Sequence, residues 1–177
     1  MIYLDNAATT LYKPRAVEQA VRRAMYGAAG YARGGYAAAD RAGELVYACR
    51  EQAAALFGVG EPERVIFTLN ATHALNIAIN ALVKPDSRVI VSGYEHNAVM
   101  RPLTARNIEP TVLDTPLWDG AAMVSALKQA LEHGADLMIL SHVSNVFGSI
   151  APLDEIAELL TAAGVPLILD ASQSAGA

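Results

Sequence analysis

The sequence predicts an α/β fold in three layers, with a mostly parallel sheet between two layers of helices. From residue 65 onward, short apolar runs typical of buried strands alternate with segments that have apolar residues at helical spacing. Gly or Pro follows several of the helical segments, as expected at helix ends. Apolar residues make up 53% and charged residues 18% of the 177 residues, which excludes a disordered chain and suffices for a domain with a core.

Residues 1–60 are predicted to form an extended and helical segment that precedes the α/β region. Pro14 suits the first turn of a helix that ends at Gly27, and residues 27–36 read as a glycine-rich loop. A second helix is expected over residues 37–57, with Cys49 on its apolar face. We therefore expect Cys49 in the core. As the single cysteine, it excludes an internal disulfide and a zinc site built from cysteines.

Residues 61–177 are predicted to form a partial cofactor-binding α/β domain. The expected strands and helices alternate along the chain. In order they are a strand at 65–68, a helix at 71–83, a strand at 88–92, a helix at 97–106, a strand at 111–113, a helix at 121–132, a strand at 136–141, a helix at 153–163 and a strand at 166–170. This alternation implies parallel strands with helices on both faces of the sheet.

Charge and composition narrow the class of protein. The net charge is −5 and no cluster of Lys and Arg is present, so nucleic acid and anionic membranes are not expected partners. The longest uncharged stretch, residues 65–83, contains Asn, Thr and His, which argues against a membrane span. Because the first residues carry no signal peptide, we expect a cytoplasmic protein.

Polar residues gather where the expected strands end. They lie in four segments, at residues 69–73, 93–97, 142–148 and 170–173. The carboxyl ends of parallel strands share one edge of a sheet, so these segments are expected to converge there on a ligand site. This convergence is more informative than any one motif.

Each candidate residue in these segments has two interpretations. The start of a helix at Asn70, Ala71 and Thr72 suits a phosphate, but Asn and Thr equally cap helices. Asp170 suits a metal, a ribose or a protonated ring nitrogen, or it closes the next turn. His96 suits acid/base chemistry or stacking on a ring, or it is an ordinary loop histidine. Few acidic residues lie on this edge, so no metal site is expected.

Five stretches of the sequence together resemble the class V aminotransferase family of pyridoxal-phosphate enzymes, and most closely its cysteine desulfurase group. They occur in the family's order and cover nearly the whole chain, at residues 3–10, 70–76, 95–99, 144–148 and 170–176. The resemblance implies the large domain of a pyridoxal-phosphate-dependent transferase, incomplete in this chain. A dinucleotide-binding turn is not supported, because residues 69–74 contain no glycine.

The resemblance implies that pyridoxal 5'-phosphate is the cofactor and assigns residues to it. Ala71 and Thr72 would bind the phosphate. His96 would be the catalytic residue of the chain, stacking on the pyridine ring and moving protons. Asp170 would pair with the pyridinium nitrogen, and Gln173 would donate a hydrogen bond to the phenolic oxygen.

The resemblance also implies a substrate and partners. Asn145 would contact the phenolic oxygen or the substrate carboxylate, and Ala7 and Ala8 would line the substrate side. The reaction would convert L-cysteine to L-alanine and leave an enzyme persulfide, whose sulfur serves iron–sulfur cluster assembly through a sulfur-acceptor protein. The full-length enzyme would be a homodimer. Selenocysteine lyase or transaminase activity would use the same residues.

The lysine and cysteine chemistry of the family does not map onto this chain. The family's Schiff-base lysine and persulfide cysteine match positions beyond residue 177. The lysines of this chain, Lys13, Lys84 and Lys128, do not match the position of the Schiff-base lysine. We therefore expect the N-terminal portion of a longer enzyme, inactive or non-catalytic by itself. The expected strand at 65–68 would also lack its antiparallel neighbour, which would leave one sheet edge bare.

Overall fold

The computed structural model describes residues 2–4 and 8–176, and their contacts divide the chain into two compact units, residues 1–67 and 68–177. The boundary between the two domains expected from the sequence, at residue 60, stays a prediction.

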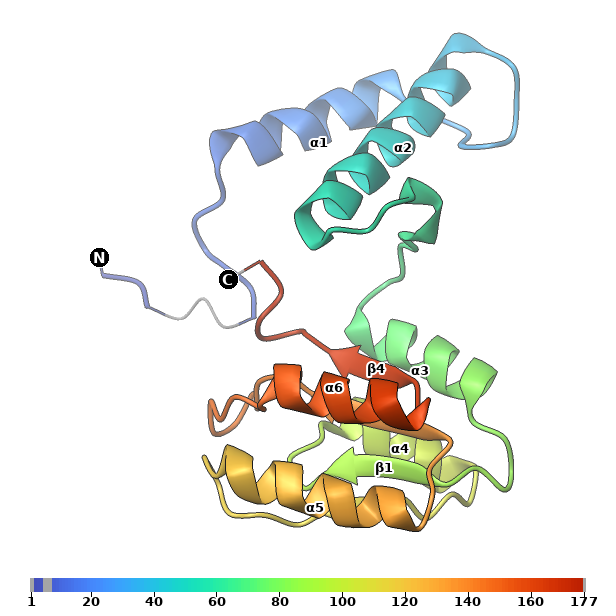
Figure 1. The fold of residues 1–177 in the computed structure, drawn as a ribbon. Helices are drawn as coiled ribbons and strands as arrows, with labels where there is room; N and C mark the ends of the chain where they lie inside the picture. The colour runs from blue at the N-terminus through green and yellow to red at the C-terminus, as the bar shows by residue number, and fades with distance from the viewer. Residues whose placement is uncertain (1, 5–7, 177) are drawn as a thin grey trace. The chain divides into compact units, whose positions relative to one another are not determined.

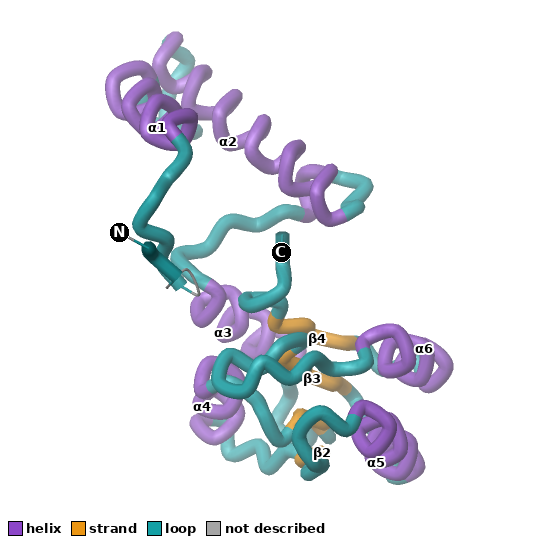
Figure 2. Tube along the Cα trace, turned by 90° about the vertical axis from the view of Figure 1, so that its left-hand side faces the viewer, coloured by secondary structure: helices purple, strands orange, loops and turns teal. Residues whose placement is uncertain are grey.

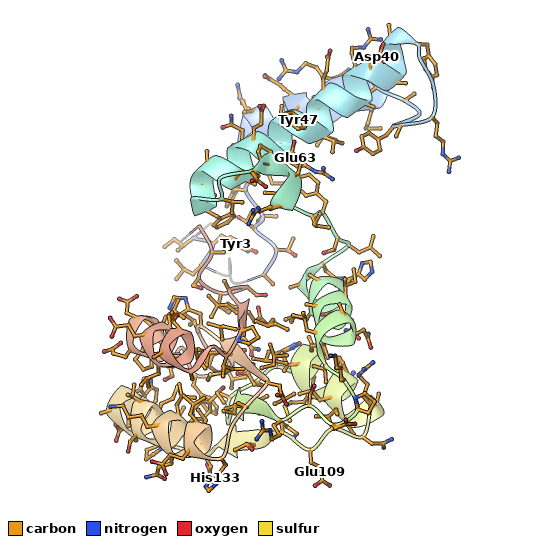
Figure 3. The ribbon with its side chains drawn as sticks, turned by 45° about the vertical axis from the view of Figure 1, so that its right-hand side comes forward. Tyr3, Asp40, Tyr47, Glu63, Glu109 and His133 are labelled. Carbon is orange, nitrogen blue, oxygen red and sulfur yellow. The ribbon has the colours of Figure 1, made fainter. Side chains whose placement is uncertain are left out.

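The first unit contains the helices α1 (Arg15–Gly27) and α2 (Ala37–Phe57) and the short 3-10 helix η1 (Pro62–Arg64). The expected helix ends are confirmed, with Pro14 before α1 and Gly58, in the left-handed region at φ +66°, after α2. Figure 3 shows Tyr47 of α2 near Glu63 of η1, where Tyr47 Oη donates to Glu63 Oε1 at 3.2 Å. This bond and the charge of Glu63 raise the pKa of Tyr47.

The apolar stripe of α2 is less buried than its sequence predicts. The structure places Cys49 at the surface, so the expected core position is wrong. Within the described residues of this unit, α2 packs on α1 and η1, and these cover too little of it to bury Cys49 or Leu45. No helix in the described parts of the chain has the length and apolar character needed to cross a membrane.

The second unit has the predicted α/β alternation, with every element from residue 71 onward present. Its strands are β1 (Val89–Ser92), β2 (Thr111–Leu113), β3 (Leu137–Ser141) and β4 (Leu167–Asp170). Its helices are α3 (Ala71–Leu82), α4 (Asn97–Ala105), α5 (Gly120–Glu132) and α6 (Leu153–Ala163). Figure 1 shows them along the chain, from green at α3 to red at β4.

The four strands form a fully parallel sheet in the order β2-β1-β3-β4. Ile90 pairs with Thr111 on one side of β1 and with Met138 on the other, and Ser141 pairs with Asp170 at the far end of β3. The chain leaves β1 toward β2 and later continues from β3 toward β4. The carboxyl ends of β1 and β3 therefore flank the point at which the strand order reverses.

Helices cover both faces of this sheet, as Figure 2 shows with α3 and α4 on one side and α5 and α6 on the other. The strand residues alternate between the two faces. Val89, Val91 and Ile139 share a buried cluster with α3 and α4 residues, whereas Ile90 and Met138 share another with residues of α5 and α6. Burial on both faces explains why these strands are continuous apolar runs in the sequence.

The strand expected at residues 65–68 is absent from the structure. Val65 to Thr68 follow η1 without pairing to any described strand, and the side chains of Ile66 and Phe67 are 69% and 50% exposed. A strand requires a neighbour to satisfy its backbone N–H and C=O groups. The apolar pattern at these residues is therefore insufficient by itself to form one.

Candidate functional site

A cavity opens in the second unit at the carboxyl edge of the sheet. Its volume is about 160 Å³, and it is partly open to solvent. All the residues assigned above to the cofactor line it, namely Ala71, Thr72, His96, Asn145, Asp170 and Gln173. The strand ends thus converge as expected, and the sequence-distant segments share one site.

The N-terminus of α3 forms one wall of the cavity. Asn70 Oδ1 accepts a hydrogen bond from His73 N at 2.9 Å, and His73 Nδ1 accepts one from Leu69 N at 3.4 Å. Asn70 therefore caps the helix, the simpler of its two interpretations. The N–H groups of Ala71 and Thr72 precede the intrahelical bonds, so the helix start offers them, with the Thr72 hydroxyl, to an anion.

Asp170 ends β4 and has only one of its carboxylate oxygens engaged by the described residues. Its Oδ1 accepts hydrogen bonds from Ser172 N at 3.0 Å and from Ser172 Oγ at 2.5 Å. Its Oδ2 accepts none from any residue that the structure describes, and Asp170 lines the cavity. A carboxylate oxygen in this state suits a cationic N–H group of a ligand.

The turn that carries Gln173 is attached to β3 through His142. The Nδ1 atom of His142 lies 2.8 Å from Ser174 Oγ, and His142 N donates to the Asp170 carbonyl at 3.0 Å. His142 does not line the cavity. It therefore acts on the site through Ser174, by fixing the turn after β4.

His96 caps α4 with its own ring. Its Nδ1 accepts a hydrogen bond from Ala98 N at 3.1 Å, and its carbonyl accepts bonds from Val99 N and Met100 N. A backbone N–H can only donate, so Nδ1 carries no proton and the neutral ring is protonated at Nε2. The side chain therefore has an N–H group to offer beside the cavity wall that it lines.

Asn145 lies in a tight loop after β3. The Oγ atom of the buried Ser144 accepts from Phe147 N at 3.3 Å, and Gly148, at φ +68°, donates from its N to the Ser144 carbonyl at 2.9 Å. The Phe147 ring packs edge-on against Tyr94, with 6.1 Å between ring centroids. This contact connects the Asn145 loop to the segment that leads into His96.

Glu95 is a part of this region that sequence reasoning left without a role. Its Oε1 accepts from Ser92 Oγ at 2.6 Å and from Ser141 N at 2.9 Å, and its Oε2 accepts from Ser141 Oγ at 2.8 Å. Burial raises the pKa of Glu95, and the hydrogen bonds from Ser92 and Ser141 oppose that rise. The sequence signal was its place directly before His96, at a strand end.

The cavity fits a ligand that is anionic at one end and carries a protonated ring nitrogen. The N–H groups at the start of α3 favour the anion and Oδ2 of Asp170 favours the cation, since none of these groups is paired within residues 2–4 and 8–176. His96 adds a flat ring to the same wall. A phosphorylated pyridine has these features, so the residues present fit pyridoxal 5'-phosphate.

Ala7 and Ala8, the residues expected on the substrate side, do not belong to the unit that contains the cavity. Ala8 is exposed in the first unit, and Ala7 falls outside the described residues, so their place beside the substrate stays a prediction. In the described ranges 2–4 and 8–176, no group of His, Cys, Asp and Glu side chains is arranged to hold a metal ion.

Comparisons with known proteins agree with this geometry. The family model described as aminotransferase class-V matches residues 2–177. The cysteine desulfurase IscS of Shewanella loihica is 35% identical, over 99% of this chain and 45% of that protein. The chain thus spans about half the length of the curated relatives it matches.

Solved structures show the same similarity. The cysteine desulfurase of Thermococcus onnurineus NA1 superimposes with a TM-score of 0.86 at 26% identity, over 99% of this chain and 45% of that one. DndA of Streptomyces lividans gives a TM-score of 0.75 at 32% identity, over 98% and 50%. From the family match and this fold, the chain belongs to the class-V aminotransferase family.

Proposed function

We propose that this chain binds pyridoxal 5'-phosphate and forms the cofactor-binding part of a desulfurase that takes sulfur from L-cysteine. Class-V aminotransferases depend on this cofactor as a family, and the curated relatives are named cysteine desulfurases. One observation carries the proposal for this chain. The free carboxylate oxygen of Asp170 lines the same cavity as the uncapped N–H groups of α3.

Six of the residues that line the cavity have roles in this proposal. Ala71 and Thr72 bind the phosphate through backbone N–H groups and the Thr72 hydroxyl. Asp170 accepts a hydrogen bond from the N–H group of the pyridinium ring and keeps that nitrogen protonated. The bound cofactor then supplies an electron sink for chemistry at the substrate α-carbon. Gln173 donates to the phenolic oxygen.

The remaining roles concern proton transfer and the substrate. His96 stacks on the ring and holds a proton at Nε2, where it is available for transfer. Asn145 binds the phenolic oxygen or the substrate carboxylate, and Ala7 and Ala8 line the substrate side. In the reaction, the carbon–sulfur bond of cysteine breaks and sulfur passes to an enzyme thiolate, which leaves alanine and a persulfide. We expect a homodimer, a sulfur-acceptor protein and a cytoplasmic location.

Cofactor affinity tests this proposal directly. Titration of the chain with pyridoxal 5'-phosphate, followed by absorbance and by equilibrium dialysis, is expected to show saturable binding. Asp170→Asn should weaken it about tenfold to a hundredfold, the scale of a lost charged hydrogen bond. Asp154→Asn is the matched control, because Asp154 is an exposed acid in the first turn of α6.

The phosphate assignment has its own test. Thr72→Ala should weaken binding, and inorganic phosphate should compete with the cofactor for the wild-type chain. Absence of saturable binding in the wild type, or equal affinity of wild type and Asp170→Asn, would contradict the proposed function.

A further inference from the structure

Glu95 occupies the point at which the strand order of the sheet reverses. Its carboxylate connects Ser92 at the end of β1 to Ser141 at the end of β3 through three hydrogen bonds of 2.6 to 2.9 Å. No short loop joins β1 to β3, because Glu95 and Ser141 are 46 positions apart in the sequence. The side chain of Glu95 thus holds together two strand ends that border the cavity.

The groups that Glu95 holds belong to the cavity wall or lead directly into it. Ser141 lines the cavity, and both its N–H and its hydroxyl hydrogen are committed to Glu95. His96 follows Glu95 in the chain and is the N-cap residue of α4. Its ring accepts a hydrogen bond from Ala98 N, so the position of the ring depends on the position of the His96 backbone. The Glu95 carboxylate anchors the turn from Ser92 to His96 at one point and Ser141 at another.

We propose that Glu95 is a positioning residue for the cofactor site, which sets the orientation of the His96 ring and of Ser141. This inference rests on the proposed function, since it assigns Glu95 to the same cavity. Glu95 is not among the residues that line the cavity, so it acts through its neighbours.

The chemistry of the side chain argues against a role in stability alone. A half-buried carboxyl group among serines loses part of its hydration, and among the described residues no Lys, Arg or His forms an ion pair with Glu95. An amide would accept a hydrogen bond from Ser141 N without placing a charge between the strand ends. Charged groups that are partly removed from water without an ion-pair partner are concentrated at functional sites, where they fix the geometry of the binding residues.

Two variants of Glu95 separate positioning from simple packing. Glu95→Ala removes the acceptor from three hydrogen bonds, whereas Glu95→Gln keeps an acceptor for Ser141 N and a polar partner for the hydroxyls. We expect Glu95→Ala to weaken pyridoxal 5'-phosphate binding about tenfold, and Glu95→Gln to restore most of it. Glu109→Ala is the control, because Glu109 is exposed on the loop before β2, at the opposite edge of the sheet (Figure 3).

A second measurement reads His96 without the cofactor. Ring ¹⁵N signals of the histidines distinguish a ring protonated at Nε2 from one that exchanges between tautomers. We expect His96 to show the Nε2 form in the wild type and in Glu95→Gln, and an averaged signal in Glu95→Ala. Ser92 does not line the cavity, and Ser92→Ala removes one donor to Glu95 together with the acceptor of Tyr94 N. Because the two bonds from Ser141 to Glu95 remain, this variant should shift the same signal less.

The outcomes distinguish this inference from the proposed function. If the wild type binds the cofactor and Glu95→Ala matches it in affinity and in the His96 signal, the positioning role is wrong and the proposed function stands. If the wild type does not bind the cofactor, the proposed function fails, and the His96 signal still decides whether Glu95 orients the ring. If Glu95→Ala does not fold, an unchanged affinity and His96 signal in Ser92→Ala overturns the inference.

Discussion

At the scale of single residues, the carboxyl group of Glu95 gives the stability of the fold a specific dependence on pH. Burial raises its pKa above the ordinary value of 4.5, against the opposing effect of its hydrogen bonds. A higher pKa in the folded state means that the folded chain binds this proton more tightly than the unfolded chain does. Ionisation of Glu95 therefore lowers the stability of the fold at neutral pH relative to the protonated form, and this cost is lost as the pH falls through the raised pKa toward the ordinary value.

This dependence can be measured against a variant that does not titrate. As the pH falls from neutral toward the ordinary value of 4.5, we expect the free energy of unfolding of the wild type to increase relative to that of Glu95→Gln. Urea unfolding at each pH gives the difference, and Glu109→Gln, at an exposed position, is the control variant. A difference that stays constant, or that changes in the opposite direction, would show that the Glu95 pKa is not raised.

At the scale of elements, the amino edge of the sheet is held by Arg88. Arg88 Nη1 donates to the His133 carbonyl at 2.8 Å, directly after α5, and Arg88 N donates to Asp136 Oδ2 at 2.8 Å. Gly134 lies between these contacts at φ +78°, and a Cβ atom there would lie 2.4 Å from Arg88 Nη1. A side chain at residue 134 would displace the guanidinium as well as strain the backbone.

Gly134→Ala should therefore destabilise the fold more than a glycine replaced at an equivalent turn. Gly164 follows α6 at φ +66°, and a Cβ atom there meets nothing within 4 Å. We expect Gly164→Ala to cost about 1–2 kcal/mol from the left-handed backbone, and Gly134→Ala about 1 kcal/mol more from the lost Arg88 hydrogen bond. Urea unfolding measures both. The extra cost should disappear in an Arg88→Ala background, and its persistence there would contradict this explanation.

The elements that could be predicted from the sequence are those whose signal is local. Helices such as α6 and strands such as β3 follow from apolar spacing and from Gly or Pro at their ends, and they agree with prediction within about two residues. The strand expected at 65–68 and the burial of Cys49 depend instead on a neighbour, and the described residues supply none. An apolar pattern predicts that a surface is to be covered, and it does not identify what covers it.

The same distinction applies to the site. The strand-end rule brought distant residues to one cavity, because the parallel sheet places all carboxyl ends together. The free oxygen of Asp170 and the tautomer of His96 required the structure, since each depends on a specific hydrogen bond. Glu95 was missed because two of its three hydrogen bonds come from a residue 46 positions away.

At the scale of the whole molecule, Lys84 and Lys128, the two lysines of the second unit, lie away from the cofactor cavity. Lys84 follows the C-terminus of α3, and the 12 residues of that helix extend about 18 Å from the cavity at its N-terminus. Lys128 lies on α5, which covers the opposite face of the sheet from α3 and α4. Lys13 belongs to the first unit, where its Nζ donates to the Thr10 carbonyl at 2.6 Å.

We therefore expect this 177-residue chain to bind the cofactor without desulfurase activity. The cavity supplies groups that hold a phosphate and a ring nitrogen, but among the residues that the structure describes no lysine lines it to bond the cofactor covalently. The chain, incubated with L-cysteine and pyridoxal 5'-phosphate, should release no alanine above a control without protein, beside the Thermococcus onnurineus enzyme as positive control. Borohydride reduction followed by peptide mapping should find no cofactor on Lys13, Lys84 or Lys128. Alanine release above the control, or specific labelling of one of these lysines, would show that the chain carries a covalent anchor of its own.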